Sequence, residues 1–176
     1  MKPIQEIFPL LGSPRKVVVT MHQKPDPDAM GSSLGFANFL KQLGHQVNVI
    51  SPTNWAEFLN WMPGCREVLD YELTREKSNA ILDAAEWVFC LDFNSLDRTR
   101  NLAPKLRSLK CDRILIDHHE QPETESFAYG ISLVSKSSTA EMVYDFIIDS
   151  GNKDKINEEI AECLYAGIIG DTGSFR

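Results

Sequence analysis

The sequence has no C-x-x-C pair, no internal repeat and no low-complexity segment. Its four cysteines are isolated from one another, and two of them lie in apolar, strand-like stretches; they are Cys65, Cys90, Cys111 and Cys163. Isolated thiols fit a reducing compartment better than a disulfide framework does. This cysteine usage predicts a cytoplasmic protein.

The chain also lacks a long hydrophobic run and an excess of basic residues. No stretch approaches the roughly 18 apolar residues of a membrane helix. The N-terminus carries Glu6 within its apolar part and has no small-residue cleavage site, so it does not resemble a secretory signal. The net charge of −7 argues against an extended basic footprint for duplex DNA. We therefore expect neither a membrane nor duplex DNA as a partner.

What remains is a chain of 176 residues, 43% of them hydrophobic, which suits one domain with a proper core. Apolar runs typical of buried strands alternate with helical patterns, and strand, polar turn, helix and strand form a βαβ unit. The predicted strands are 16–21, 46–50, 67–69, 86–91, 111–117 and 128–134, and the predicted helices are 4–11, 29–43, 75–85, 98–109, 139–151 and 155–169. The predicted fold class is α/β, with a mainly parallel sheet flanked by helices.

Acidic and histidine-bearing turns follow three of the predicted strands. One strand ends in Asp117-His118-His119, an unusual polar end to an apolar run, and another ends at Asp92. A third is followed by His22 and a turn that holds Asp26 and Asp28, where Pro25 and Pro27 oppose helix. Asp171 follows the last helix, which we expect to stop at Gly170. Sites in open α/β sheets gather at the carboxyl ends of the strands, so we expect these turns to meet.

Aspartates and neutral imidazoles without cysteine suit a divalent metal such as Mn²⁺ better than a thiolate-rich zinc site does. Four carboxylates are too repulsive to lie unpaired in one cleft. Two metal ions about 3.5–4 Å apart would neutralise them, and such pairs are used for in-line phosphoryl displacement. Taken singly, each aspartate is an ordinary turn former or helix cap. Likewise His45 is expected to be a solvated loop residue, and the metal hypothesis depends on the joint occurrence.

At this point the residues resemble the DHH phosphoesterase family, whose domain is Rossmann-like. Four segments match its motifs in order across residues 17–176: His22-x-x-x-Asp26-x-Asp28-x-x-Gly31-Ser32, Leu91-Asp92 with Arg98, Asp117-His118-His119, and Gly167 to Arg176 around Asp171. Ser138-Thr139-Ala140-Glu141 also resembles a family element, and reads as an N-cap with an acidic first turn.

The resemblance implies a role for each position. One metal ion would be held by His22, Asp26 and Asp92. The other would be held by Asp28, Asp92, His118 and Asp171, so Asp92 would bridge the two. His119 would face the substrate phosphate and Asp117 would orient it, and these two are the expected catalytic residues. Arg98 and Ser32 are the expected substrate-binding residues. The cofactors implied are two divalent ions, Mn²⁺ first and Mg²⁺ or Co²⁺ as alternatives, with a bridging hydroxide that attacks phosphorus.

Members of this family usually carry a second, C-terminal domain with a glycine-rich, histidine-bearing loop that binds substrate. This sequence ends at Arg176, directly after the fourth motif. We therefore expect residues 1–176 to be the catalytic, metal-binding domain without that partner domain, and to be inactive or weak alone.

Within the family, the resemblance is greatest to the oligoribonuclease and 3′-phosphoadenosine 5′-phosphate phosphatase group. The first motif lies about twenty residues from the start, which disfavours the membrane-bound cyclic-dinucleotide phosphodiesterases. The expected substrate is short single-stranded RNA or a nucleotide, and a homodimer is left open. Other family hydrolases are alternatives: an inorganic pyrophosphatase, an exopolyphosphatase or a RecJ-type exonuclease. The net charge of −7 weighs against the last. A regulatory nucleotide-binding domain without turnover is the alternative from another class.

Overall fold

The structure is a computed structural model that describes all 176 residues, and its centre is one seven-stranded sheet. Every strand pair is parallel, and the strand order is β1-β7-β6-β5-β2-β3-β4. The strands are β1 (Lys2–Pro3), β2 (Lys16–Thr20), β3 (Gln46–Ser51), β4 (Leu69–Asp70), β5 (Trp87–Leu91), β6 (Asp112–Asp117) and β7 (Tyr129–Ser132). The predicted fold class is confirmed, and the two-residue edge strand β1 was not predicted.

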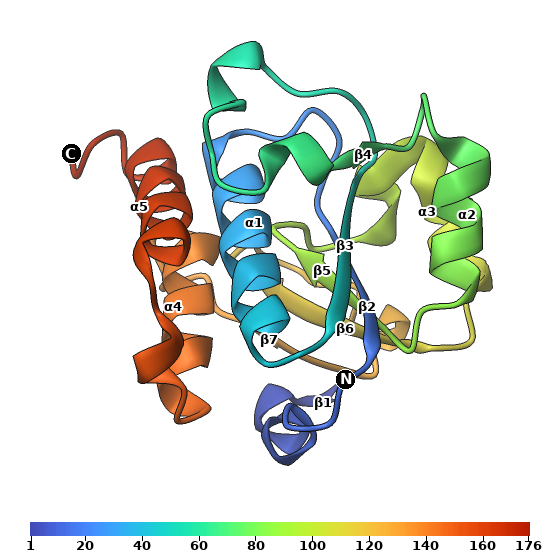
Figure 1. The fold of residues 1–176 in the computed structure, drawn as a ribbon, viewed down its shortest axis with the longest axis horizontal. Coiled ribbons are helices and arrows are strands. Elements are labelled where there is room, and N and C mark those ends of the chain that lie inside the picture. Colours follow the sequence, from blue (N-terminus) through green and yellow to red (C-terminus); the bar gives the residue numbers. More distant parts are fainter.

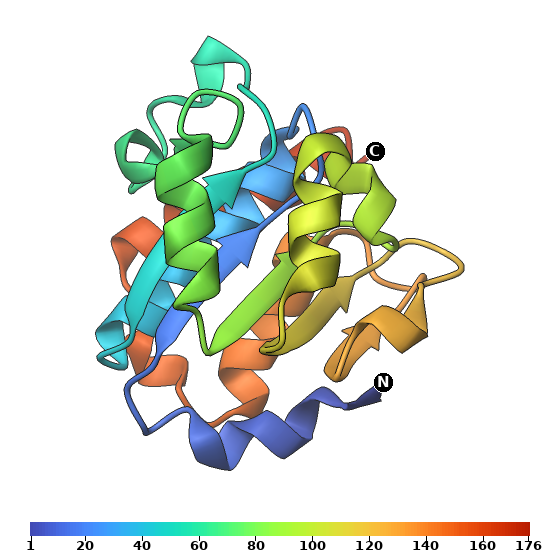
Figure 2. The ribbon, with the colours of Figure 1, turned by 90° about the vertical axis from the view of Figure 1, so that its right-hand side faces the viewer.

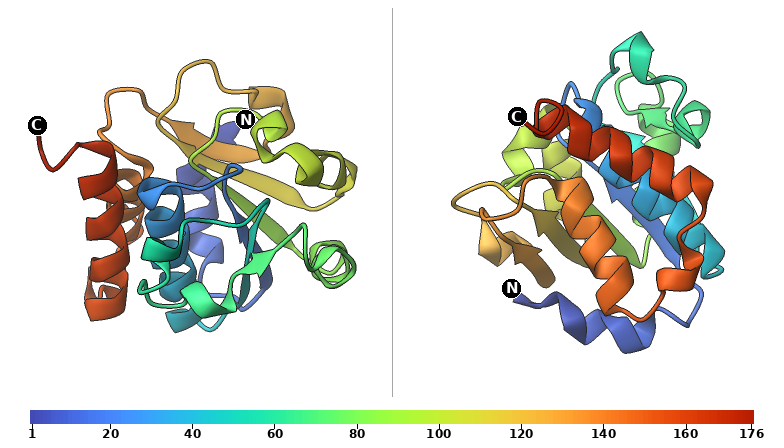
Figure 3. Two further views of the ribbon diagram at one scale, coloured as in Figure 1. Left: turned by 90° about the horizontal axis from the view of Figure 1, so that it is seen from above. Right: turned by 90° about the vertical axis from the view of Figure 1, so that its left-hand side faces the viewer.

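Helices cover both faces of the sheet. The α-helices are α1 (Pro27–Gln42), α2 (Arg75–Asp83), α3 (Ala103–Ser108), α4 (Thr139–Asp149) and α5 (Glu158–Asp171). Six short 3-10 helices are η1 (Ile4–Leu10), η2 (Glu57–Leu59), η3 (Cys65–Glu67), η4 (Leu96–Leu102), η5 (Thr124–Ser126) and η6 (Lys153–Lys155). In Figure 1, α1, α4 and α5 lie on one side of the sheet and α2 and α3 on the other. Figure 2 shows the side covered by α2 and α3, and the right-hand view of Figure 3 shows the side covered by α1, α4 and α5.

The three consecutive valines of β2 explain why the strand is apolar without alternation. Val17 and Val19 belong to the larger core cluster beneath α1, α4 and α5, whereas Val18 belongs to the cluster beneath α2 and α3. Successive side chains of a strand point to opposite faces, so a sheet covered on both faces requires apolar residues at every position.

None of the helices is both long enough and apolar enough to cross a membrane.

The prediction that Asp28 lies in a turn before the helix is wrong. Helix α1 begins at Pro27, so Asp28 is in its first turn, and Asp26 is the N-cap whose side chain accepts hydrogen bonds from the N–H groups of Asp28 and Ala29. Proline opposes helix in the interior but is favoured at the first position, where its missing N–H has no helical partner. The helix ends, as predicted, just before Gly44, whose φ is +88°.

The prediction that the last helix stops at Gly170 is also wrong, because α5 continues through Asp171. Gly170 serves packing rather than termination. A Cβ atom built there would lie 2.7 Å from the Pro27 Cβ, and one built on Gly167 would lie 2.6 Å from the Ala140 Cβ. Gly31 of α1 faces Gly167 in the same way. These glycines allow the backbones of α1 and α5 to approach closely.

Two further expectations are corrected. The segment before β6 is not one helix to residue 109, because Arg100, with φ +50° and ψ −113°, kinks the chain within η4, and α3 begins only at Ala103. His45 is buried rather than solvated, with 5% of its surface exposed, and its Nδ1 accepts a hydrogen bond from the Arg15 N–H.

Replacing Gly31 by alanine should destabilise the fold. The added Cβ would overlap the Cys163 carbonyl oxygen and lie 2.9 Å from the Gly167 nitrogen, both of which are backbone atoms in α5. Overpacking of this kind costs about 1–3 kcal/mol. Urea unfolding followed by circular dichroism should show a lower midpoint for Gly31→Ala. Gly12→Ala is the matched control, because nothing lies within 4 Å of its added Cβ. An unchanged midpoint for Gly31→Ala would contradict the close approach of α1 and α5.

Candidate metal centre

The sheet order brings the predicted site together. From β2 the chain continues to β3 and β4 on one side, and from β5 it continues to β6 and β7 on the other. The β2–β5 boundary is therefore the point where the strand order reverses, which is where open α/β sheets place ligands. Asp92 follows β5, and β5 lies between β2 and β6. Its carboxylate therefore lies between His22, after β2, and His118, after β6.

One group of side chains lies on the β2 side of Asp92. The His22 Nε2 lies 3.4 Å from the Asp92 Oδ2 and 3.7 Å from the Asp26 Oδ2. The two oxygens of Asp26 have separate tasks, because Oδ1 caps α1 while Oδ2 faces His22. The ordinary helix-cap interpretation and the ligand interpretation are therefore compatible for this residue.

A second group lies on the β6 side and shares Asp92 with the first. The His118 Nε2 lies 3.2 Å from the Asp171 Oδ2, 3.5 Å from the Asp92 Oδ1 and 4.0 Å from the Asp28 Oδ2. Asp171 reaches this point from the C-terminal end of α5. The six predicted metal ligands thus form two adjoining groups, and each group can offer three ligand atoms within 4.8 Å of one another.

In all three histidines of the centre, the Nδ1 atom faces an oxygen that can accept a hydrogen bond. The His22 Nδ1 lies 2.8 Å from the Gln23 carbonyl oxygen, and the His119 Nδ1 lies 2.7 Å from the Asp117 Oδ1. The His118 Nδ1 faces the Lys136 carbonyl oxygen at 3.4 Å. A neutral ring that donates from Nδ1 keeps Nε2 as the lone-pair nitrogen, which is the arrangement expected of a histidine that binds a metal. Asp117 is fully buried, and its Oδ2 has no hydrogen-bond partner.

The N-terminus of α4 also contributes to the centre, which the sequence did not reveal. The Asp28 carboxylate accepts hydrogen bonds from the N–H groups of Thr139 and Ala140, at 2.7 and 2.9 Å. The Thr139 hydroxyl donates to the Asp92 Oδ1 at 3.0 Å. Helix N-termini stabilise negative charge through free N–H groups and the helix dipole. The Ser138–Glu141 segment resembles a family element and has the pattern of a helix cap, but no local signal identifies Asp28 and Asp92 as its partners.

The local charges show how strongly the carboxylates repel one another. Burial raises the pKa of Asp28, and repulsion from Asp92 adds to this, so that its pKa lies at about 8. Burial also acts to raise the pKa of Asp92, but His118 and His22 outweigh burial and hold it well below the usual range. Burial lowers the pKa of His22, yet contacts with Asp26 and Asp92 prevail and raise it to about 10. Contact with Asp92 raises the pKa of His118 to about 9.

The backbone at Asp92 is strained, with φ at +63°. This left-handed conformation is uncommon for residues other than glycine, and aspartate is among those that tolerate it best. The Asp92 N–H donates to the Ile116 carbonyl at 3.1 Å, which extends the β5–β6 ladder past the end of β5. Strain of this kind persists where the surrounding structure enforces it, and it aims this carboxylate between the two histidines.

The two predicted substrate-binding residues lie differently. Arg98 is partly buried and lines a groove beside His22. Ser32 is fully buried in the second turn of α1, where its hydroxyl donates to the Ala29 carbonyl at 3.3 Å. Its hydroxyl therefore faces the helix rather than the surface of the site. The Ser32 side chain is therefore closed to solvent in this structure, and its role in substrate binding stays a prediction.

The donor set fits divalent metal ions. It consists only of carboxylate oxygens and imidazole nitrogens, the ligands of intermediate divalent metals. Two ligand atoms that each lie about 2.1 Å from one ion are about 3.0–3.4 Å from each other. The distances from the His22 and His118 Nε2 atoms to the neighbouring aspartate oxygens are similar, at 3.2–4.0 Å. A pair of cations would also replace the two positive charges that protonated His22 and His118 supply in their absence.

A model of the N-terminal domain of the DHH family matches residues 16–168. An exopolyphosphatase-related protein from Bacteroides fragilis has a solved structure that is 37% identical, with a TM-score of 0.94 over 98% of this chain and 50% of that chain. A relative from Mycoplasma genitalium, known only as uncharacterized protein MG371, is 32% identical over 91% of this chain and 46% of its own.

The curated relatives with functional names include an oligoribonuclease and a pyrophosphatase. The bifunctional oligoribonuclease and PAP phosphatase NrnA of Bacillus subtilis is 28% identical over 90% of this chain and 47% of its own. The probable manganese-dependent inorganic pyrophosphatase of Streptococcus mutans is 28% identical over 89% of this chain and 48% of its own. The chain spans about half the length of the curated relatives it matches.

Without metal ions, the stability of the protein should fall as the pH rises from about 6.5 to 10. His22, His118 and Asp28 bind their protons more tightly in the folded state than in the unfolded state. Their stabilising contribution is complete below the unfolded-state pKa values of 6.5 and 3.8, and is lost as the pH rises through about 8 to 10. The melting temperature in EDTA should therefore decrease across this range. The His22→Gln/His118→Gln variant should show a flatter profile. A parent profile as flat as that of the variant would contradict the prediction.

Proposed function

Because the chain belongs to the DHH family, we propose that it is the metal-binding half of a phosphoesterase that hydrolyses short oligoribonucleotides and 3′-phosphoadenosine 5′-phosphate. The observation that carries this proposal is the sharing of Asp92 by two groups of ligands at the β2–β5 boundary. Two adjoining cation positions with a common carboxylate suit the in-line displacement of a phosphate ester.

His22, Asp26 and Asp92 would hold one divalent cation, and Asp28, Asp92, His118 and Asp171 the other. When bound, such a pair lowers the pKa of water and stabilises negative charge on phosphoryl oxygens. Manganese is the preferred ion, since it suits this donor set and appears in the name of the pyrophosphatase relative.

The protein itself supplies orientation and one hydrogen bond to the substrate. The Asp117 carboxylate holds the Nδ1 of His119, whose side chain is 34% exposed, so Nε2 can face a phosphate. His119 also lies edge-on to His118, with ring centroids 4.7 Å apart, which restricts both rings. As an imidazolium, His119 would donate from Nδ1 to Asp117 and from Nε2 to a phosphoryl oxygen. A donor placed in advance stabilises charge that develops on that oxygen without reorganisation during the reaction. His119 is therefore proposed as a substrate-contacting catalytic residue and Asp117 as the residue that positions it.

The choice of substrate depends on similarity to the B. subtilis NrnA protein. It also depends on the segment Thr172-Gly173-Ser174-Phe175-Arg176 after Asp171, which resembles the oligoribonuclease and PAP phosphatase group. The equal identity to a pyrophosphatase makes pyrophosphate the competing substrate. Both substrates present a phosphorus atom that must lie beside Asp92 and His119, and they differ in whether a nucleoside follows it.

A direct test compares the two substrates in the full-length protein. With Mn²⁺, we expect release of mononucleotides from dinucleotides to pentanucleotides, with little release of phosphate from pyrophosphate. Chromatography of the nucleotide products and a colorimetric phosphate assay measure the two reactions. Cleavage of pyrophosphate with the oligonucleotides left intact would refute the oligoribonuclease assignment. Absence of metal-dependent turnover on either would favour a binding domain.

Two substitutions separate metal binding from orientation. Asp117→Asn should lower kcat about 10- to 100-fold, as is typical when a partner that orients a site residue is lost, while both metal ions remain bound. Asp92→Ala should cost more activity and should reduce the bound Mn²⁺ counted by metal analysis, since it removes the shared carboxylate. Asp112→Asn is the matched control for Asp117, because Asp112 lies exposed at the other end of β6. Full Mn²⁺ occupancy in Asp92→Ala would contradict its role as the common ligand.

A further inference from the structure

A polar groove adjoins the metal centre on its β2 side. It has a volume of about 570 Å³, and no hydrophobic residue lines it. The lining residues are His22, Gln23, Lys24, Asp97, Arg98 and Arg100. His22 is also a proposed ligand of the first cation, so the groove opens directly from one end of the centre.

The groove is positively charged although the protein as a whole carries −7. Lys24, Arg98 and Arg100 form no salt bridge in the structure. The one acidic residue of the groove outside the metal centre, Asp97, pairs with Arg107 at 3.1 Å. The three cations beside the centre therefore have no carboxylate that neutralises them, and Lys24 and Arg100 are exposed.

The β6 side of the centre is different. The lysine that follows β7, Lys136, lies within 2.9 Å of Glu141 and 2.6 Å of Asp145, so both neighbours neutralise its charge. The distribution of unpaired cations is thus asymmetric about Asp92. A polyanion bound at the centre would be drawn toward Lys24 and Arg100 rather than toward α4.

The backbone presents these cations at a conformational cost. Lys24 has φ +48°, and Arg100 has φ +50° with ψ −113°. Hydrogen bonds between loops hold Lys24 and connect its loop to the segment before Arg100: the Lys24 N–H donates to the Thr53 hydroxyl at 2.8 Å, and the Gln23 N–H donates to the Arg98 carbonyl at 3.0 Å. Strained conformations of residues other than glycine cluster at sites where the geometry serves binding or catalysis. Glycine would relieve the strain at either position but would supply no charge.

We propose that Lys24 and Arg100 bind a second phosphate of the substrate, one nucleotide away from the phosphate at the metal centre. The inference rests on the proposed function, because it assumes that a phosphate ester occupies the centre. It goes further by making the two cations specificity-determining residues that favour substrates with at least two phosphates. Lys is suited to this as a point charge, and Arg can bind phosphate oxygens through two parallel N–H groups.

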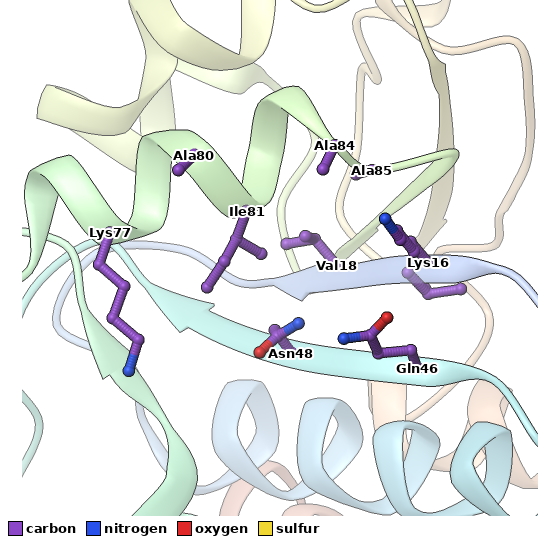
Figure 4. Close-up of a pocket in the computed structure, with 10 residues that line it drawn as sticks. Lys16, Val18, Gln46, Asn48, Lys77, Ala80, Ile81, Ala84 and Ala85 are labelled. Atoms are coloured by element: carbon purple, nitrogen blue, oxygen red, sulfur yellow. The ribbon is translucent and has the colours of Figure 1, made fainter.

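A second cavity provides the matched control. It has a volume of about 300 Å³ and lies between α2 and the first residues of β2 and β3, at the end of the sheet opposite the metal centre (Figure 4). Lys77 lines it, and the side chain extends along its edge in Figure 4. Lys77→Gln removes one positive charge from the protein without touching the groove.

The kinetic test compares two substrates of the full-length protein in Mn²⁺. One is a 5′-phosphorylated dinucleotide, and the other is bis(p-nitrophenyl) phosphate, which has a single phosphorus atom. The ratio of their kcat/KM values should fall about tenfold in Lys24→Gln and in Arg100→Gln, the effect expected for loss of one hydrogen bond to a charged group. Lys77→Gln should leave the ratio unchanged. If the parent cleaves both substrates and all three variants keep the parent's ratio, the groove assignment is wrong and the proposed function stands.

A binding test does not depend on turnover. Calorimetric titration with a phosphorothioate-linked, 5′-phosphorylated dinucleotide, repeated over a range of KCl concentrations, gives the slope of log Kd against log salt. Removal of one phosphate contact should reduce that slope by about 0.7. Each groove variant should therefore show a shallower slope than the parent and Lys77→Gln. Unchanged slopes would refute the inference. Failure of the parent to cleave either substrate would refute the proposed function, and the slopes would still decide the role of the groove.

Arg100→Gly separates charge from strain. It removes the same charge as Arg100→Gln and also relieves the positive φ, so its melting temperature should exceed that of Arg100→Gln and of the parent. Its substrate ratio should equal that of Arg100→Gln. A ratio equal to that of the parent would show that substrate preference does not need the charge at position 100, and would overturn the role of Arg100.

Discussion

Mutual repulsion among buried carboxylates is the constraint on which the rest of this structure depends. Asp28 and Asp92 are almost completely buried, and Asp26 and Asp171 lie beside them. Such a cluster is stable only if positive charge or hydrogen-bond donors compensate it. The structure provides donors from the N-terminus of α4 to Asp28 and imidazolium partners to Asp92. Both the unusual pKa values and the fitness for divalent cations follow from this one arrangement.

The same constraint accounts for the close helix packing around the site. The N-terminus of α4 reaches Asp28, and Asp171 reaches His118, only because α1 approaches α4 and α5 closely. Glycines at 31, 167 and 170 leave the room that this approach requires. The family motifs that contain these glycines therefore serve the helix contacts as well as the metal ligands.

Much of the fold was predictable because its signals are local. Continuous apolar runs such as Val17 to Val19 indicate strands covered on both faces, and Gly44 marks the end of a helix. The errors arose where tertiary contacts override such signals. Gly170 resembles a helix stop but packs against Pro27, and Pro27 resembles a helix breaker but begins α1. His45 resembles a loop histidine, yet a hydrogen bond from the Arg15 backbone accompanies its burial.

The sequence by itself determined which chemical groups the site can use, because aspartate and histidine at the ends of apolar runs are visible without coordinates. It also determined that these groups lie at the carboxyl ends of strands. Only the tertiary structure decided their neighbours: the order β6-β5-β2 places Asp92 between two histidines, and the α4 N-terminus faces Asp28. The position of the unpaired cations Lys24 and Arg100 beside His22 was likewise decided by packing between loops. The physical reason is that strand order and loop contacts depend on interactions between residues far apart in the chain, and no local pattern records them.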